Sequence, residues 1–136
     1  MVFEEQALKG VFIINPTIFY DERGSFFESF KNNVFEEKLN CKFVQDNEVF
    51  SKKVDTLRGL HYQIENPQAK LIHVVSGAIK DVIVDLRVNS KTFGESFSVN
   101  LDHKNHKMLF IPVGFAHGYL VLKKNTIVQY KCTDYY

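Results

Sequence analysis

The chain has 136 residues, of which 45% are hydrophobic and 14% aromatic, and this is enough apolar material for one core. Its 17 Lys and Arg residues nearly balance its 16 Asp and Glu residues, which leaves a formal net charge of +1. This balance argues against a nucleic-acid-binding surface and against a strongly acidic partner. We therefore expect one globular domain over residues 1–136.

The cysteines and the N-terminal segment indicate the compartment. Cys41 and Cys132 lie far apart and neither belongs to a CxxC pair, which argues against a zinc module and favours two buried, reduced thiols. The acidic start of the chain, MVFEEQALKG, has no basic region followed by an apolar core, and no run approaches the roughly 18 apolar residues of a membrane span. These features predict a cytoplasmic protein that does not associate with a membrane.

Predicted elements follow one another closely along the chain. The first strand covers residues 10–15 and ends at Pro16, because proline supplies no donor to a β-ladder. Turn-forming residues occupy positions 21–24, and the apolar spacing over residues 29–40 predicts one short helix. Short β-rich runs separated by polar or glycine-containing breaks then predict strands at 43–50, 57–63, 70–75, 78–87, 95–101, 107–112, 118–123 and 126–132.

The breaks between these strands are too short for the crossovers that parallel strands need. We therefore expect antiparallel sheets. The sequence shows no internal repeat, low-complexity tract or linker. It predicts a mainly β chain folded as one antiparallel jelly-roll-like or barrel-like unit with a single helix.

The first candidate for chemistry is the histidine of RGLHYQ, residues 58–63. The imidazole of His61 titrates near neutral pH and can take or give a proton, while the fork of donors on Arg58 suits a phosphate or a carboxylate. A strand histidine with a purely structural role is the alternative. Regular alternation places Arg58 and His61 on opposite faces, so both line one pocket only if Gly59 bends the strand or creates a bulge. We expect that irregularity.

Lys70 is the second candidate, because strand alternation places it on the same face as Ile72 and Val74. Its ammonium would then face apolar surroundings, poised to meet a developing negative charge. In the alternative, Lys70 lies at the strand end and extends to water. Tyr130 shares a face with Val128 and is expected to point inward, where its hydroxyl needs a partner.

Two acidic residues of the strand predicted at 78–87, Asp81 and Asp85, share a face with Arg87. We favour structural ion pairs with Arg87 for both, and the alternative is that Asp81 orients a histidine. His117 lies in the glycine-containing segment IPVGFAHGYL. Two roles are open for it: a structural role at a loop or strand end, or a role in the functional site. His73, His103 and His106 show no functional pattern.

We expect no catalytic metal. Gln63 occupies the position at which a second histidine would complete a two-ligand chelate with His61, so the ligand set would need distant residues. Proton transfer without a cofactor is the chemistry that the residues favour.

Six segments together resemble the dTDP-4-dehydrorhamnose 3,5-epimerases, the metal-independent cupin enzymes of dTDP-L-rhamnose synthesis. They are RGLHYQ, DERGSFFESF, QDNEVFS, KTFG, IPVGFAHGYLVL and YKCTDYY, and the resemblance covers nearly the whole chain, in the family's order and approximate spacing. The resemblance implies a jelly-roll cupin, a homodimer and a dTDP-linked 4-keto-6-deoxy sugar as substrate.

The resemblance also implies roles for individual residues. His61 looks like the general base, Tyr130 looks like the general acid on the opposite face of the sugar, and Lys70 resembles the residue that stabilises the enolate oxygen. Arg58 resembles the pyrophosphate-binding arginine. Residues resembling pocket positions are Gln45, Asn47, His117 and Tyr136, and the segment that reaches the partner subunit's site in the family contains Arg23, Phe26 and Glu28.

The sequence departs from the family pattern at two places. Family members continue past TDYY with a segment whose aspartate pairs with the base histidine, whereas this sequence stops at Tyr136. Two alternatives follow: the sequence is a truncated or short form, or another carboxylate partners a histidine, with Asp81 as the best candidate in this sequence. NEVFS also replaces the histidine and serines that commonly follow the asparagine. Three functions therefore remain as alternatives: epimerisation at C3, C5 or both, ketoisomerisation of a sugar nucleotide, and nucleotide-sugar binding without catalysis.

Overall fold

The computed structural model describes residues 1–136 and contains twelve strands and one helix. In chain order these are β1 (Val2–Glu5), β2 (Phe12–Asn15), β3 (Phe19–Asp21), β4 (Gly24–Phe26), α1 (Asn32–Leu39), β5 (Gln45–Ser51), β6 (Leu57–His61), β7 (Lys70–Ser76), β8 (Ala78–Asp85), β9 (Ser96–Asp102), β10 (Met108–Ile111), β11 (Phe115–Val121) and β12 (Thr126–Cys132).

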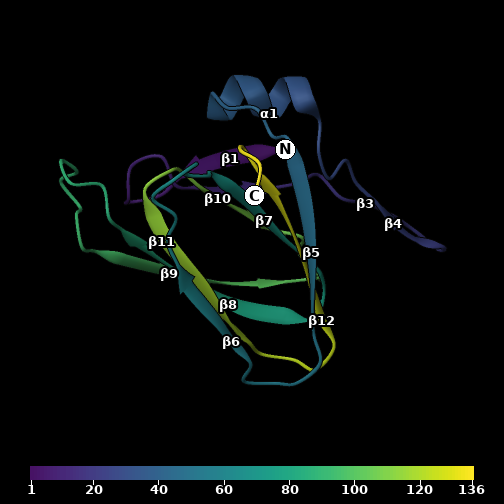
Figure 1. The fold of residues 1–136 in the computed structure, drawn as a ribbon. Coiled ribbons are helices and arrows are strands. Elements are labelled where there is room, and N and C mark those ends of the chain that lie inside the picture. Colours follow the sequence, from purple (N-terminus) through teal and green to yellow (C-terminus); the bar gives the residue numbers. More distant parts are fainter.

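Two antiparallel sheets form the body of the molecule (Figure 1). The larger has six strands in the order β1-β2-β10-β7-β12-β5, and the smaller has four in the order β6-β11-β8-β9. Consecutive strands such as β7 and β8 lie in different sheets, as in a jelly roll. The predicted mainly β, antiparallel jelly-roll fold is confirmed.

The main core fills the space between the sheets. Ile72 and Val74 of β7 meet Ile79 and Ile83 of β8 there, and all four are completely buried. Their even spacing, two residues in β7 and four in β8, reflects strand alternation, since every second side chain points inward. The same alternation brings polar side chains of these strands to the inner face, and this is what makes a site between the sheets possible.

The helix α1 lies outside the barrel, above β1 in Figure 1. It begins at Asn32, three residues later than predicted, and ends where Asn40 adopts a left-handed conformation. Phe35 and Leu39 face a second core cluster that includes Ile14 and Phe110 on the outer side of the larger sheet. The helix is neither long nor apolar enough to cross a membrane.

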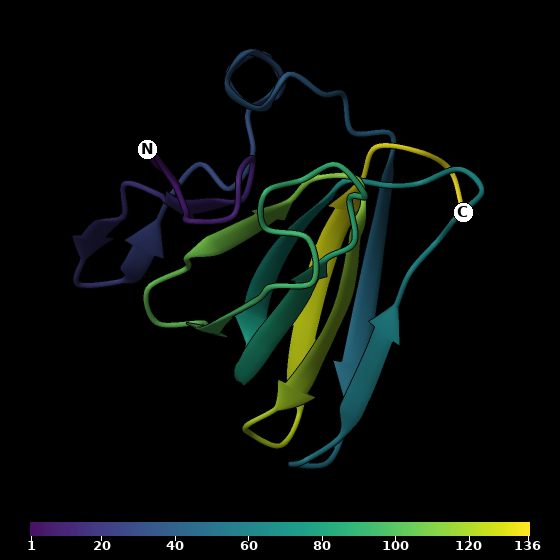
Figure 2. The ribbon, with the colours of Figure 1, turned by 90° about the vertical axis from the view of Figure 1, so that its left-hand side faces the viewer.

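The structure adds strands that the sequence pattern does not predict. β1 pairs with β2 although its residues are mostly exposed. β3 and β4 form a hairpin arm over residues 19–26 that extends away from the body (Figures 1 and 2), and all of its strand residues are exposed. The predicted turn at 21–24 is its tip, where Asp21 Oδ1 accepts a hydrogen bond of 2.8 Å from the Arg23 amide. Neither element buries an alternating face, so period-two patterning could not reveal them.

Candidate active site

A cleft opens between the two sheets at the edges formed by β5 and β6. It consists of two adjoining hollows of about 690 and 370 Å³, and both are lined by His61, Lys70 and Tyr130. The larger hollow continues to Asn47 and Tyr136, and the smaller one to Arg58 and His117. The fold therefore brings together, in one cleft, residues that lie up to 89 positions apart in the sequence.

A bulge in β6 turns Arg58 and His61 to the same cleft. His61 pairs with His117 and Arg58 pairs with Tyr119, so three steps along β6 span two steps along β11. Gly59 has φ of +87°, a conformation that L side chains rarely adopt. The expected irregularity at Gly59 is confirmed.

Two glycines allow β6 and β11 to approach closely at this bulge. A Cβ atom on Gly59 would lie 2.5 Å from the carbonyl oxygen of His117, and one on Gly118 would lie 2.6 Å from that of Arg58. Both distances are impossible for real atoms in contact. The backbones consequently need glycine at both positions to hold the two histidines opposite each other.

His61 lies at the rim of the cleft and its side chain is exposed. No carboxylate of the chain forms an ion pair with its ring. Arg58 is held more firmly, because Nε donates a hydrogen bond of 3.0 Å to Ser51 Oγ and Nη2 donates one of 3.2 Å to the Phe50 carbonyl. The remaining guanidinium hydrogens are available to an anion in the cleft.

Lys70 and Tyr130 face these residues from the larger sheet. They come from the neighbouring strands β7 and β12, and Lys70 Nζ lies 5.5 Å from the centre of the Tyr130 ring. Burial lowers the pKa of Lys70, opposed by the nearby Cys132 and Asp81. Burial also raises the pKa of Tyr130, so the phenol keeps its proton at neutral pH.

A chain of polar contacts borders the larger hollow. Tyr136 donates its amide hydrogen to Gln45 Oε1 at 3.1 Å, and Gln45 Nε2 donates to Asn47 Oδ1 at 3.1 Å. Asn47 Nδ2 in turn lies 3.7 Å from Cys132 Sγ inside the barrel. The structure thus places three of the sequence-predicted residues side by side, on the wall that also carries Tyr130.

The predicted ion pair between Asp81 and Arg87 is wrong. Asp81 Oδ2 lies 2.8 Å from His117 Nε2 in the interior, whereas Asp85, four residues further along β8, accepts the hydrogen bonds of Arg87. Two pleats of the strand separate the carboxylates, so only Asp85 reaches the loop that carries Arg87. His117 lies inside β11, not at a strand end or in a loop, and is 7% exposed.

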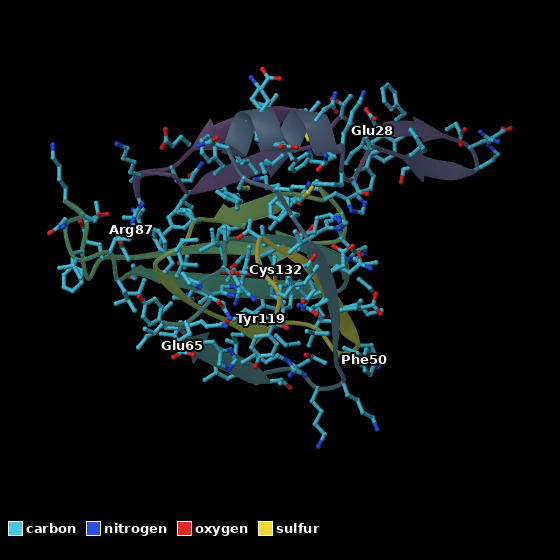
Figure 3. All side chains as sticks on the ribbon, turned by 45° about the horizontal axis from the view of Figure 1, so that its top comes forward. Glu28, Phe50, Glu65, Arg87, Tyr119 and Cys132 are labelled. Carbon is cyan, nitrogen blue, oxygen red and sulfur yellow. The ribbon has the colours of Figure 1, made fainter.

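The remaining predicted residues do not reach this cleft. Arg23 and Phe26 belong to the arm, with Arg23 bound to Asp21 at 2.7 Å, and Glu28 follows the arm, 3.9 Å from Lys31. Figure 3 shows Glu28 near the base of the arm, while Tyr119 and Cys132 lie in the body of the molecule. The arm therefore contributes nothing to the cleft of its own chain.

Sequence reasoning missed Tyr119. It is 5% exposed, lines the smaller hollow and pairs with Arg58 on one side and Asp81 on the other, so the three form one row across the smaller sheet. Its hydroxyl has no hydrogen-bond partner within the chain. Its position two residues after His117, which places both side chains on the same face of a strand, was the signal that could have identified it. No group of three or more His, Cys, Asp or Glu residues is arranged to hold a metal ion.

The family model described as dTDP-4-dehydrorhamnose 3,5-epimerase matches residues 5–136. The chain belongs to this family. A dTDP-4-dehydrorhamnose 3,5-epimerase of Methanothermobacter thermautotrophicus is 50% identical, over 98% of this chain and 72% of its own length.

Solved structures agree with this assignment. A dTDP-6-deoxy-D-glucose-3,5-epimerase from Legionella pneumophila, in complex with dTDP-4-keto-L-rhamnose, matches with a TM-score of 0.94 and 44% identity over 99% of this chain and 72% of that one. A 3'-monoepimerase from Streptomyces bikiniensis, in complex with dTDP-quinovose, matches with a TM-score of 0.89 and 30% identity over 97% and 68%. The chain is an isomerase of the sugar-nucleotide epimerase family.

Proposed function

We propose that this epimerase inverts C3, C5 or both carbons of a dTDP-4-keto-6-deoxyhexose, in the synthesis of dTDP-L-rhamnose or a related deoxysugar. One observation carries the assignment of roles: the cleft has His61 on the smaller sheet and Tyr130 on the larger sheet, with Lys70 beside Tyr130. Inversion needs a base on one face of the carbon and an acid on the other, and two opposing sheets supply them.

His61 is the proposed base. A hydrogen on the carbon next to the C4 ketone is acidic only while the enolate oxygen is stabilised, and Lys70 supplies the positive charge for this. Tyr130 then returns a proton to the opposite face of the carbon. Its raised pKa keeps the phenol protonated, and therefore able to donate, at neutral pH.

The nucleotide occupies the outer part of the cleft in this proposal. Arg58 contacts the pyrophosphate, since its guanidinium is fixed by Ser51 and Phe50 with donors to spare. Gln45, Asn47, His117 and Tyr136 contact the rest of the substrate. Because no Asp or Glu of this chain pairs with His61, the orienting carboxylate proposed at Asp81 acts on His117.

The arm supports a homodimer in which each subunit completes its partner's site. Phe26 is 67% exposed and Tyr20 71% exposed on a hairpin that makes no contact with its own cleft, and such apolar surface is typical of an interface. Arg23, Phe26 and Glu28 would then contact the substrate held by the partner. We place the protein in the cytoplasm, where free thiols such as Cys41 and Cys132 stay reduced.

Solvent deuterium tests the proposal. The protein is incubated with dTDP-4-keto-6-deoxyglucose in D₂O, and C3 and C5 are followed by NMR. Deuterium at both carbons is expected for a 3,5-epimerase. Exchange at C3 alone would identify a monoepimerase, which is what the Streptomyces bikiniensis relative is. Product with the ketone at another carbon would identify a ketoisomerase. Binding without any exchange would refute catalysis.

A further inference from the structure

The hydroxyl of Tyr119 is a buried polar group that the fold does not use. Tyr119 is 5% exposed, and its side chain belongs to the main core together with Ile79 and Val121. Its Oη atom is buried and has no hydrogen-bond partner in the chain. Burying an unpaired hydroxyl costs free energy that a phenylalanine at the same position would not cost. Packing alone therefore gives no reason for a tyrosine here.

Tyr119 lies beside the groups that hold Arg58 in place. On β11 it pairs with Arg58 of β6, and both residues line the smaller hollow. Burial raises the pKa of Tyr119, while the charge of Arg58 and the hydroxyl of Ser51 are near enough to oppose this shift. Arg58 and Ser51 are themselves joined by the hydrogen bond of 3.0 Å from Nε to Oγ. The three polar groups therefore form one cluster at the wall of the smaller hollow.

The hydroxyl of Ser51 has a hydrogen to spare. Ser51 is 3% exposed, and its Oγ accepts the hydrogen bond from Arg58 but donates none. A serine hydroxyl can accept and donate at the same time, and a hydroxyl that donates is also a stronger acceptor, because hydrogen bonds in a chain polarise one another. An acceptor for the Ser51 hydrogen would therefore strengthen the bond that orients Arg58.

We propose that Tyr119 is a positioning residue for Arg58: when the diphosphate binds, Tyr119 Oη accepts the hydrogen of Ser51, and Ser51 then holds the guanidinium against the anion. The inference rests on the proposed function, in which Arg58 contacts the pyrophosphate. The free chain leaves both hydroxyls unpaired, and the small side-chain shifts that accompany binding are sufficient to join them. A guanidinium held in this way loses less freedom on binding, which favours affinity.

A different partner for Tyr119 would have a different consequence. Asp81 Oδ1 is the other buried atom without a hydrogen-bond partner, and Asp81 pairs with Tyr119 on the side opposite Arg58. A hydrogen bond from Tyr119 to Asp81 would act on the part of the cleft that holds His117, and not on the diphosphate contact. The two routes are therefore separated by whether removal of the hydroxyl changes substrate affinity or the rate of the bound substrate.

Calorimetry with dTDP on the full chain tests the effect on affinity. Tyr119→Phe should raise the Kd of dTDP about fivefold, the scale of one hydrogen bond, and should unfold at the wild-type temperature or above it, because the free chain loses no bond. Tyr135→Phe removes the same hydroxyl from a side chain that is 67% exposed and lines neither hollow, and it should bind dTDP as the wild type does. A lower unfolding temperature with unchanged dTDP affinity would show a structural role and overturn the proposal.

A double-mutant cycle tests the route through Ser51. Ser51→Ala removes the hydroxyl that connects Tyr119 to Arg58, and it should weaken dTDP binding by itself. Adding Tyr119→Phe to Ser51→Ala should then cost no further affinity, because the connection is already broken. If the losses of the two single variants multiplied in the double variant, Tyr119 would act on the ligand without Ser51 and the proposal would be wrong.

Steady-state kinetics complete the test. Tyr119→Phe should raise KM about fivefold and keep kcat within about twofold of the wild type, as expected for a group that acts on binding. A fall in kcat with an unchanged KM would point to the route through Asp81 and refute the role at Arg58. Absence of deuterium exchange in the wild type would refute the epimerase function alone, since dTDP binding still decides the role of Tyr119. A wild type that does not bind dTDP would refute both.

Discussion

A histidine pair on the outer face of the larger sheet predicts how acid destabilises the fold. His73 Nε2 lies 3.4 Å from His106 Nδ1, and the Phe27 ring packs against both, with centres 5.8 Å from His73 and 4.3 Å from His106. Burial of the ring, and then the neighbouring His106, lower the pKa of His73 from 6.5 to about 4. The pair therefore folds in its neutral form.

The sign of the effect follows from proton binding. Between pH 6.5 and pH 4 the unfolded chain binds a proton at His73 that the folded chain does not. The free energy of unfolding is therefore unaffected by protonation of His73 above pH 6.5, and it decreases as the pH falls through this window. Each pKa unit corresponds to about 1.4 kcal/mol, so lowering the pH from 7 to 4.5 should remove about 2 kcal/mol through His73. His106, whose pKa is also lowered, acts in the same direction.

Urea unfolding at pH 7.0 and pH 4.5 measures this contribution. His73→Gln removes the titrating group, so its free energy of unfolding should fall by about 2 kcal/mol less than that of the wild type between the two pH values. His103→Gln, which lacks a different histidine, should show the wild-type loss. If His73→Gln and the wild type lost the same amount, the acid sensitivity would come from other groups and the reasoning would be wrong.

Three further predictions concern the site and its support. Gly118→Ala should destabilise the chain by about 2 kcal/mol or more in urea unfolding and reduce deuterium exchange, because the added methyl group collides with the Arg58 carbonyl; an unaffected variant would contradict the close contact. Asp85→Asn should lower the free energy of unfolding by about 3 kcal/mol, because the buried carboxylate accepts five hydrogen bonds. Burial raises the pKa of Asp85, but the hydrogen bonds from Arg87 and two hydroxyls outweigh this and lower it. Thermal unfolding close to that of the wild type would refute this prediction. Lys70→Met should keep dTDP binding, measured by calorimetry, and lose at least about 100-fold in exchange rate, whereas equal losses of binding and exchange would point to a structural role.

Most of the fold follows from local patterning. From residue 43 onward, β-rich runs between polar breaks predict eight strands. These eight correspond to β5–β12, with ends shifted by a few residues. The pattern does not predict β1 or the strands of the arm, because these strands pair with a neighbour without burying either of their faces. Exposed pairing leaves no apolar alternation to detect.

The chemical groups that line the cleft could be predicted from the sequence pattern. Strand alternation indicates an inward Lys70 and Tyr130, and the glycine of RGLHYQ indicates the bulge that lets Arg58 and His61 share one cleft. The partners of the acidic residues, in contrast, depend on how the strands are arranged in the folded chain. Asp81 and Asp85 are equivalent in sequence terms, two pleats apart on one face of β8. The register between β8 and β11 brings His117 diagonally against Asp81, while Asp85 meets the loop after β8. A pattern along one strand specifies a face, but a partner across strands depends on register, which the whole barrel sets.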